Sequence, residues 1–68
     1  MNPKESWSVE IAGKSYRFTL TEEDDIFTLT VHQGGRYVEE VWFRTRGDVQ
    51  PFIHEFIKGR EVRYASHD

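Results

Sequence analysis

The sequence predicts an α+β fold, in which a four-stranded antiparallel β-meander is followed by one C-terminal α-helix packed on one sheet face. Three observations predict this ββββα order. Four segments alternate between apolar and polar residues, short turn-forming segments separate them, and a later segment spaces its apolar residues as an amphipathic helix does. A chain of 68 residues can build one core, so we expect a single domain over residues 1–68. Residues 1–6 and 65–68 are expected to be flexible.

The first hairpin is predicted from two alternating segments around a glycine. The inward residues are Trp7, Val9 and Ile11 before the turn, and Tyr16, Phe18 and Leu20 after it. We expect Gly13 and Lys14 to form a two-residue turn, which pairs Ala12 with Ser15. This register sets Val9 beside a phenylalanine, so the two inward sets share one face.

Four adjacent carboxylates predict the tip of the second hairpin. The like charges of residues 22–25 cannot be buried together, so we expect this run to form the loop. After it, Phe27, Leu29 and Val31 alternate with more polar neighbours, as in a strand. Pairing Leu20 with Phe27 keeps the inward residues of three strands on one face.

The turn into the fourth strand decides which way Trp42 faces. A two-residue turn of Gly34 and Gly35 would send Glu40 into the core, where it would lie opposite Leu29 with no evident partner. Because an unpaired buried carboxylate is costly, we expect a different loop.

A three-residue loop over residues 33–35 avoids that cost, with Gly35 in the left-handed conformation. In this register the inward residues are Tyr37, Val41 and Phe43, and the outward residues are Val38, Glu40, Trp42 and Arg44. Glu39 shares the inward parity, so we expect it at the sheet margin, within reach of water.

An amphipathic helix is predicted after the fourth strand. Asp48 is a suitable N-cap, and Pro51 falls at the third helical position, where its missing N–H costs no hydrogen bond. The apolar residues at helical spacing are Val49, Phe52, Ile53, Phe56 and Ile57. Gly59 is expected at the C′ position that ends the helix. Residues 60–64 alternate weakly and allow a short fifth edge strand.

Composition narrows the functional classes. The net charge is −3, so we expect no generally basic surface for nucleic acid. The sequence has no cysteine, which excludes disulfides, thiolate nucleophiles and cysteine zinc sites. Neither a signal peptide nor a membrane span is recognisable, so we expect a cytoplasmic protein.

Catalytic and metal-binding patterns do not stand out, so we expect no enzyme activity, no metal and no cofactor. The three histidines, His32, His54 and His67, are scattered. His54 and Glu55 begin like a zinc-protease motif, but Lys58 stands where that motif needs its second histidine. The contiguous carboxylates of residues 22–25 also lack the alternating spacing of a calcium loop.

The sheet face away from the helix carries the strongest functional signal. The predicted register places there Trp42, Val38, Ile26, Arg17 and Arg44. Trp and Arg are enriched at interface hot spots, so this face predicts a small non-enzymatic protein-interaction module, either an inhibitor or regulator or a homodimer. The plainer interpretation is that a small sheet leaves a few apolar residues exposed, or that the C-terminal tail folds over Trp42.

Single-stranded nucleic acid is the alternative partner, with Trp42 or Tyr37 stacking on bases. The phosphates would be held by Arg36, Arg44 and Arg46.

The order of four antiparallel strands and a helix resembles the half-unit of the PUR-repeat and transcriptional-coactivator families, which bind single-stranded DNA through a sheet. This resemblance implies the same use of the sheet here. In size and acidic charge the chain is similar to phage-encoded inhibitors such as anti-CRISPR proteins, which act by occupying a partner's surface.

Overall fold

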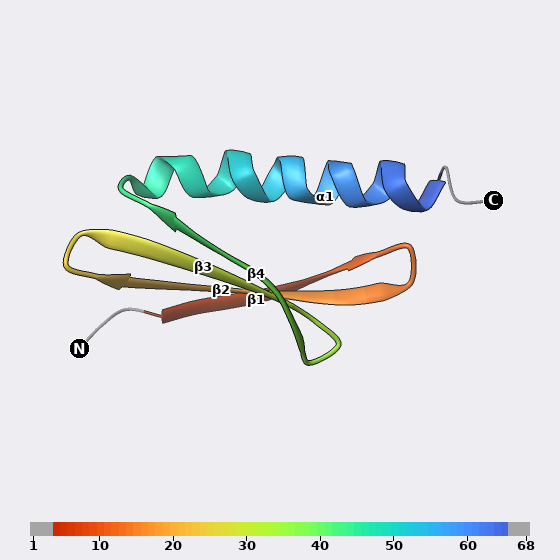
Figure 1. The fold of residues 1–68 in the computed structure, drawn as a ribbon, viewed down its shortest axis with the longest axis horizontal. Helices are drawn as coiled ribbons and strands as arrows, with labels where there is room; N and C mark the ends of the chain where they lie inside the picture. The colour runs from red at the N-terminus through yellow and green to blue at the C-terminus, as the bar shows by residue number, and fades with distance from the viewer. Residues whose placement is uncertain (1–3, 66–68) are drawn as a thin grey trace.

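The computed structural model describes the backbone of residues 4–65 and the side chains of residues 4–61. Four antiparallel strands form one sheet in the order β1-β2-β3-β4, and α1 lies across one of its faces (Figure 1). The elements are β1 (Lys4–Ile11), β2 (Lys14–Glu23), β3 (Ile26–Gln33), β4 (Arg36–Phe43), the short 3₁₀ helix η1 (Arg46–Asp48) and α1 (Val49–Ala65). The predicted ββββα fold is confirmed.

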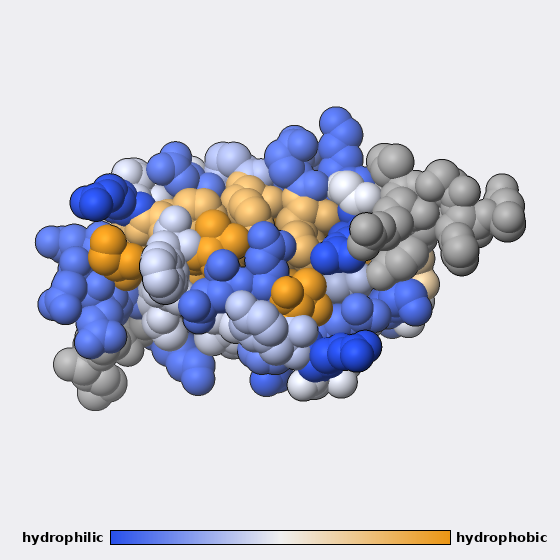
Figure 2. Space-filling model, viewed as in Figure 1, coloured by the Kyte–Doolittle hydropathy of each residue, from blue (hydrophilic) through white to orange (hydrophobic). Residues whose placement is uncertain are grey.

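The hydrophobic core lies between α1 and the sheet face that it covers, here called the inner face. Its buried residues are Ile11, Tyr16, Phe18, Leu20, Leu29, Val31, Val49 and Ile53. Phe56 joins the two layers, because its ring meets those of Tyr16 and Phe18 edge-on, with 5.7 Å between centroids in each pair. Figure 2 shows a band of hydrophobic residues between the helix and the sheet, so the core reaches the surface along this side.

All three hairpins close with a two-residue turn whose residues both have positive φ, as in type I′ turns. The turn residues are Ala12 and Gly13, Asp24 and Asp25, and Gly34 and Gly35. Type I′ turns twist in the same sense as the strands that they join, which suits a meander built from consecutive hairpins. All three turns correct the predicted loops.

The first hairpin turns one residue earlier than predicted. Ile11 pairs with Lys14, and Val9 lies opposite Tyr16 instead of a phenylalanine. The turn therefore uses Gly13 as its second residue, where φ is 80°. Because the partner strand moves by an even number of residues, the same side chains still face the core.

The second hairpin is longer than predicted. Leu20 lies opposite Leu29, and Glu22 opposite Phe27, so the predicted pairing of Leu20 with Phe27 is wrong. Glu22 and Glu23 belong to β2 and the two aspartates alone form the turn. The glutamates can extend the strand because they lie at the open end of the sheet, where their carboxylates reach water.

The third hairpin combines a two-residue turn with a β-bulge, an arrangement that hydrophobic alternation alone does not predict. Gly34 and Gly35 form the turn, so the predicted three-residue loop is wrong. Farther along, His32 pairs with Tyr37 but Val31 pairs with Glu39. The intervening Val38 is the extra residue of the bulge.

The bulge resets the side-chain alternation of β4. Glu40 and Trp42 face outward as predicted, although the turn is the one expected to send them inward. Two predictions fail for the same reason: Tyr37 lies on the outer side, and Val38 packs partly buried against the core. Glu39 stays exposed on the helix side, as predicted for a residue at the sheet margin.

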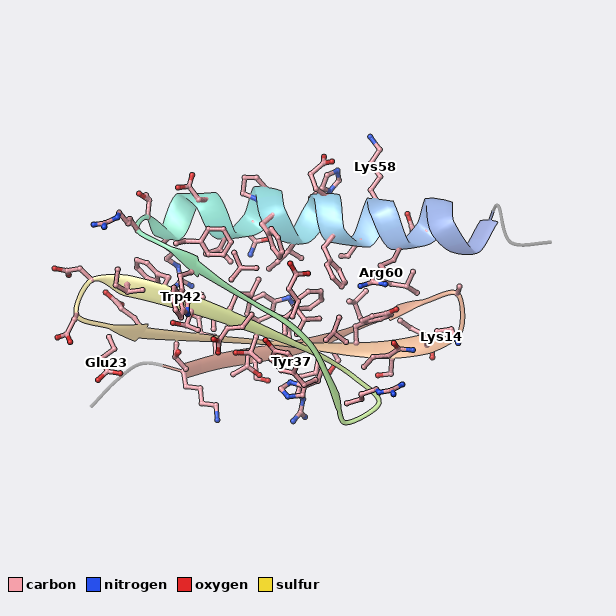
Figure 3. The ribbon with its side chains drawn as sticks, viewed as in Figure 1. Lys14, Glu23, Tyr37, Trp42, Lys58 and Arg60 are labelled. Atoms are coloured by element: carbon pink, nitrogen blue, oxygen red, sulfur yellow. The ribbon has the colours of Figure 1, made fainter. Side chains whose placement is uncertain are left out.

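Helix α1 begins after η1 and continues well beyond the predicted end at Gly59. A helical glycine costs only about 1 kcal/mol relative to alanine, and the following residues are mostly good helix formers. Arg60 also lies over the Phe56 ring, 4.9 Å from its centroid, and points toward the sheet in Figure 3. The predicted fifth strand over residues 60–64 is therefore absent, because this segment is helical.

The start of the chain is also more ordered than predicted. Residues 4–6, expected to be flexible, belong to β1 and pair with β2 from Lys4 opposite Thr21 onward. Ala65 is the last residue of α1. The remaining predicted flexible residues, 1–3 and 66–68, lie outside the described part of the chain.

Candidate functional site

The candidate site is the sheet face opposite α1, here called the outer face. Paired residues of adjacent strands share a face, so the register defines three rows across the sheet. The rows are Lys4, Thr21, Thr28 and Trp42; then Ser6, Thr19, Thr30 and Glu40; then Ser8, Arg17, His32 and Tyr37. Among the described elements, the only helix of any length packs on the inner face, which leaves this surface open (Figure 1).

Trp42 is the most exposed large apolar side chain on this face. It lies opposite Thr28 on β3, and 70% of its surface is accessible to solvent. The other tryptophan, Trp7, is half-buried and stacks on Phe18 with 6.0 Å between ring centroids. The fold therefore uses one tryptophan for packing and leaves the other available for contact.

A shallow hollow of about 530 Å³ adjoins Trp42. It is lined by Glu23, Asp24, Ile26, Thr28, Trp42, Phe43 and Arg44. The hollow combines an indole, an aliphatic side chain, a guanidinium group and two carboxylates within one open depression. Such a mixture suits a partner that inserts one apolar group and makes polar contacts around it.

Tyr37 provides a second aromatic side chain at the other end of β4. It is 61% exposed and meets the His32 ring edge-on, with 6.1 Å between centroids. Arg17 lies opposite His32 on the neighbouring strand. Figure 3 shows Tyr37 on the side of the sheet away from α1, so this cluster belongs to the outer face.

Hydroxyl groups fill the area between the two aromatic residues. The threonines of the two central strands, Thr19, Thr21, Thr28 and Thr30, are half-buried, and Ser6 and Ser8 of β1 are exposed. Each hydroxyl can both donate and accept a hydrogen bond, so this stripe can pair with either donors or acceptors on a partner. Charges of both signs border it, including Lys4, Arg17, Glu10 and Glu40.

Five of the seven predicted site residues lie on the outer face, in two groups. Trp42, Ile26 and Arg44 meet at the hollow, and Arg17 and Tyr37 lie at the opposite end. The other two are misplaced, because Val38 packs toward the core and Arg46 lies beside the start of α1.

Arg46 is engaged on the inner side of the sheet. Its guanidinium forms an ion pair with Glu5 at 2.5 Å, where the side chains are 57% and 46% exposed. Together with Trp7, Val49 and Gln50, this pair borders a separate small hollow. Arg46 therefore cannot act with the outer-face arginines.

Three residues of this surface are not among the predicted site residues. Glu23 and Asp24 line the hollow, and His32 packs beside Tyr37. Strict alternation with Thr28 and Thr30 already assigns His32 to the outer face. The two acidic residues could have been found by recognising the aspartate pair as a type I′ turn, which places Glu23 opposite Ile26.

The described side chains form no group of three or more His, Cys, Asp or Glu residues that could hold a metal ion. Over residues 4–65, the structure also has no helix long and apolar enough to cross a membrane. No protein-family profile matches the chain, and no curated protein or solved structure is significantly similar to it.

Proposed function

We propose that this protein is a small, non-enzymatic, cytoplasmic interaction module that inhibits or regulates a protein partner through its outer face. The observation that supports this most directly is the exposure of Trp42 beside the hollow. A tryptophan that is 70% exposed on a rigid sheet lowers solubility and adds little to the core, which favours a binding role.

The mixed charges of the outer face favour a protein partner over a nucleic acid. Three cationic side chains, Lys4, Arg17 and Arg44, are offset by Glu23 and Glu40 on the same surface. A phosphate backbone requires a predominantly positive surface, whereas a protein partner can match mixed charges. The partner is expected to place an apolar group in the hollow against the indole, with hydrogen-bonding groups around it.

The test is partner capture with matched variants. The wild-type chain and Trp42→Glu are used as baits in an extract of the native cell, and captured proteins are identified by mass spectrometry. His54→Glu is the control, because it adds the same charge at an exposed position of α1. A partner retained by the wild type and the control but lost with Trp42→Glu supports the proposal. Partners that bind all three baits equally contradict it.

Single-stranded nucleic acid is a second candidate, supported by two exposed aromatic side chains on one face. Trp42 and Tyr37 could stack on bases, with Arg17 and Arg44 near the phosphates. The test is a titration with short oligonucleotides at low and moderate salt. Binding that weakens with salt and is lost in Trp42→Ala would favour this candidate, whereas no binding at low salt removes it.

A further inference from the structure

The two edges of the sheet differ in how they could accept another strand. The β4 edge carries the bulge at Val38 followed by Glu39 and Glu40, and bulges and charges of this kind discourage edge pairing. The β1 edge pairs with β2 over its whole described length without a register shift. Among the described residues nothing pairs with its other side.

The turn geometry determines which backbone groups β1 presents at this edge. In a two-residue hairpin, the residues that flank the turn exchange hydrogen bonds, so Ile11 and every second residue before it bond to β2. The alternate residues direct their N–H and C=O groups outward. These are Lys4, Ser6, Ser8 and Glu10.

We propose that two copies of this chain pair through β1, antiparallel, about a two-fold axis at Trp7. In this register Lys4 of each copy lies opposite Glu10 of the other, and Ser6 lies opposite Ser8. The outward backbone groups of the two strands then meet as hydrogen-bonded pairs. Two sheets become one continuous sheet.

Charge complementarity selects this register over its neighbours. Lys4 and Glu10 both project on the outer face, and neither forms an ion pair with any described residue. Antiparallel pairing about Trp7 brings them together twice, once at each end of the shared ladder. Sliding one strand by two residues places Lys4 opposite Ser8 or Glu10 opposite Ser6, which loses both ion pairs.

The inner face contributes an aromatic contact at the axis. Trp7 is half-buried, and its ring is nearly parallel to that of Phe18, at an interplanar angle of 23°. Because the backbone of Trp7 bonds to β2, the two Trp7 residues at the axis form a non-hydrogen-bonded pair across the dimer. The Cα atoms of such a pair lie closer together than those of a hydrogen-bonded pair. The two Trp7 side chains would therefore cover each other's exposed parts, and Val9 would gain cover from the partner strand.

This assembly goes beyond the proposed function, because it uses the β1 edge and leaves the hollow at Trp42 open, although Lys4 belongs to both surfaces. Both copies of α1 would lie on one side, and the two outer faces would join on the other. Trp42, on the strand farthest from β1, would stay free at each end of the dimer.

Analytical ultracentrifugation with charge-reversed variants tests the proposal. The wild type is expected to form a dimer with a dissociation constant in the micromolar range. Lys4→Glu alone and Glu10→Lys alone should each weaken it about tenfold or more, because both place like charges opposite each other. An equimolar mixture should restore dimers, since each chain then meets its complement.

Ser8→Pro provides a backbone test. It removes an outward N–H without touching a bond to β2, so circular dichroism should be unchanged while dimerisation is lost. Trp42→Glu should dimerise like the wild type. A wild-type chain that stays monomeric up to millimolar concentration overturns the proposal, as does a mixture of the charge-reversed chains that remains monomeric.

Discussion

Thr28 lies directly opposite Trp42 across β3 and β4, on the sheet face that α1 does not cover. This pairing holds the indole on a rigid strand at 70% exposure, where it takes little part in packing. The surface proposed to recognise a partner can therefore be altered by mutation without disturbing the core.

Trp42→Glu should abolish partner binding while changing the free energy of unfolding by less than about 0.5 kcal/mol. The reason is that the substitution removes an exposed anchor and leaves the core intact. Urea denaturation measures stability, and calorimetric titration with the captured partner measures affinity. A large loss of stability would show that the indole has a packing role instead.

Arg44→Ala and Arg46→Ala should differ although both remove one arginine near the end of the sheet. Arg44 lines the hollow beside Trp42, so its loss should weaken partner binding by about tenfold, equivalent to about 1.4 kcal/mol. Arg46 pairs with Glu5 on the other side of the sheet. Its loss should leave affinity unchanged and cost less than about 0.5 kcal/mol of stability, since the pair is half-exposed. Equal effects on affinity would argue against the outer face.

Ala12→Asn should stabilise the fold by about 0.5–1 kcal/mol. Ala12 has φ of 52°, a left-handed conformation that alanine adopts at a cost and asparagine tolerates well. Asparagine would also create the Asn-Gly pair preferred in type I′ turns. Thermal unfolding should report a higher midpoint for Ala12→Asn. Ala12→Val is the control and should lower it, because a β-branched residue fits this conformation poorly.

Gly59→Ala should also stabilise the fold, by about 0.5–1 kcal/mol. Gly59 is an exposed residue within α1, and an added Cβ would meet no heavy atom within 4 Å. Helical circular dichroism and urea denaturation check the gain. If the helix instead ended at Gly59 in a left-handed cap, the same substitution would lower stability.

The predicted elements were reliable where one side of a strand or helix had to be apolar. Buried positions must be apolar, so their spacing along the sequence reveals the element to which they belong. The two layers are identified in this way by the inward residues of β2 and β3 and by the helical spacing of Val49 and Ile53. Errors arose in the turns. A register can slide by two residues without moving any side chain to the other face, so hydrophobic alternation alone does not determine where a hairpin turns.

The outer face was only partly predictable for a related reason. Trp42 was assigned correctly, but from a loop that does not exist, since the bulge at Val38 restores the alternation that the Gly34-Gly35 turn disturbs. A bulge leaves little trace in a single sequence, because its extra residue need not be glycine or polar. The helix end was misjudged because Gly59 is tolerated inside a helix when the residues around it hold the conformation.

Because Val38 is an extra residue, a chain that lacked it could keep every backbone pairing between β3 and β4. Its β4 edge would then be as regular as that of β1. With β1 joined to β1 as proposed, a second open edge would let β4 join β4 as well, and association would no longer close at two copies. The extra residue, together with Glu39 and Glu40, would thus keep the proposed assembly finite instead of an open-ended filament.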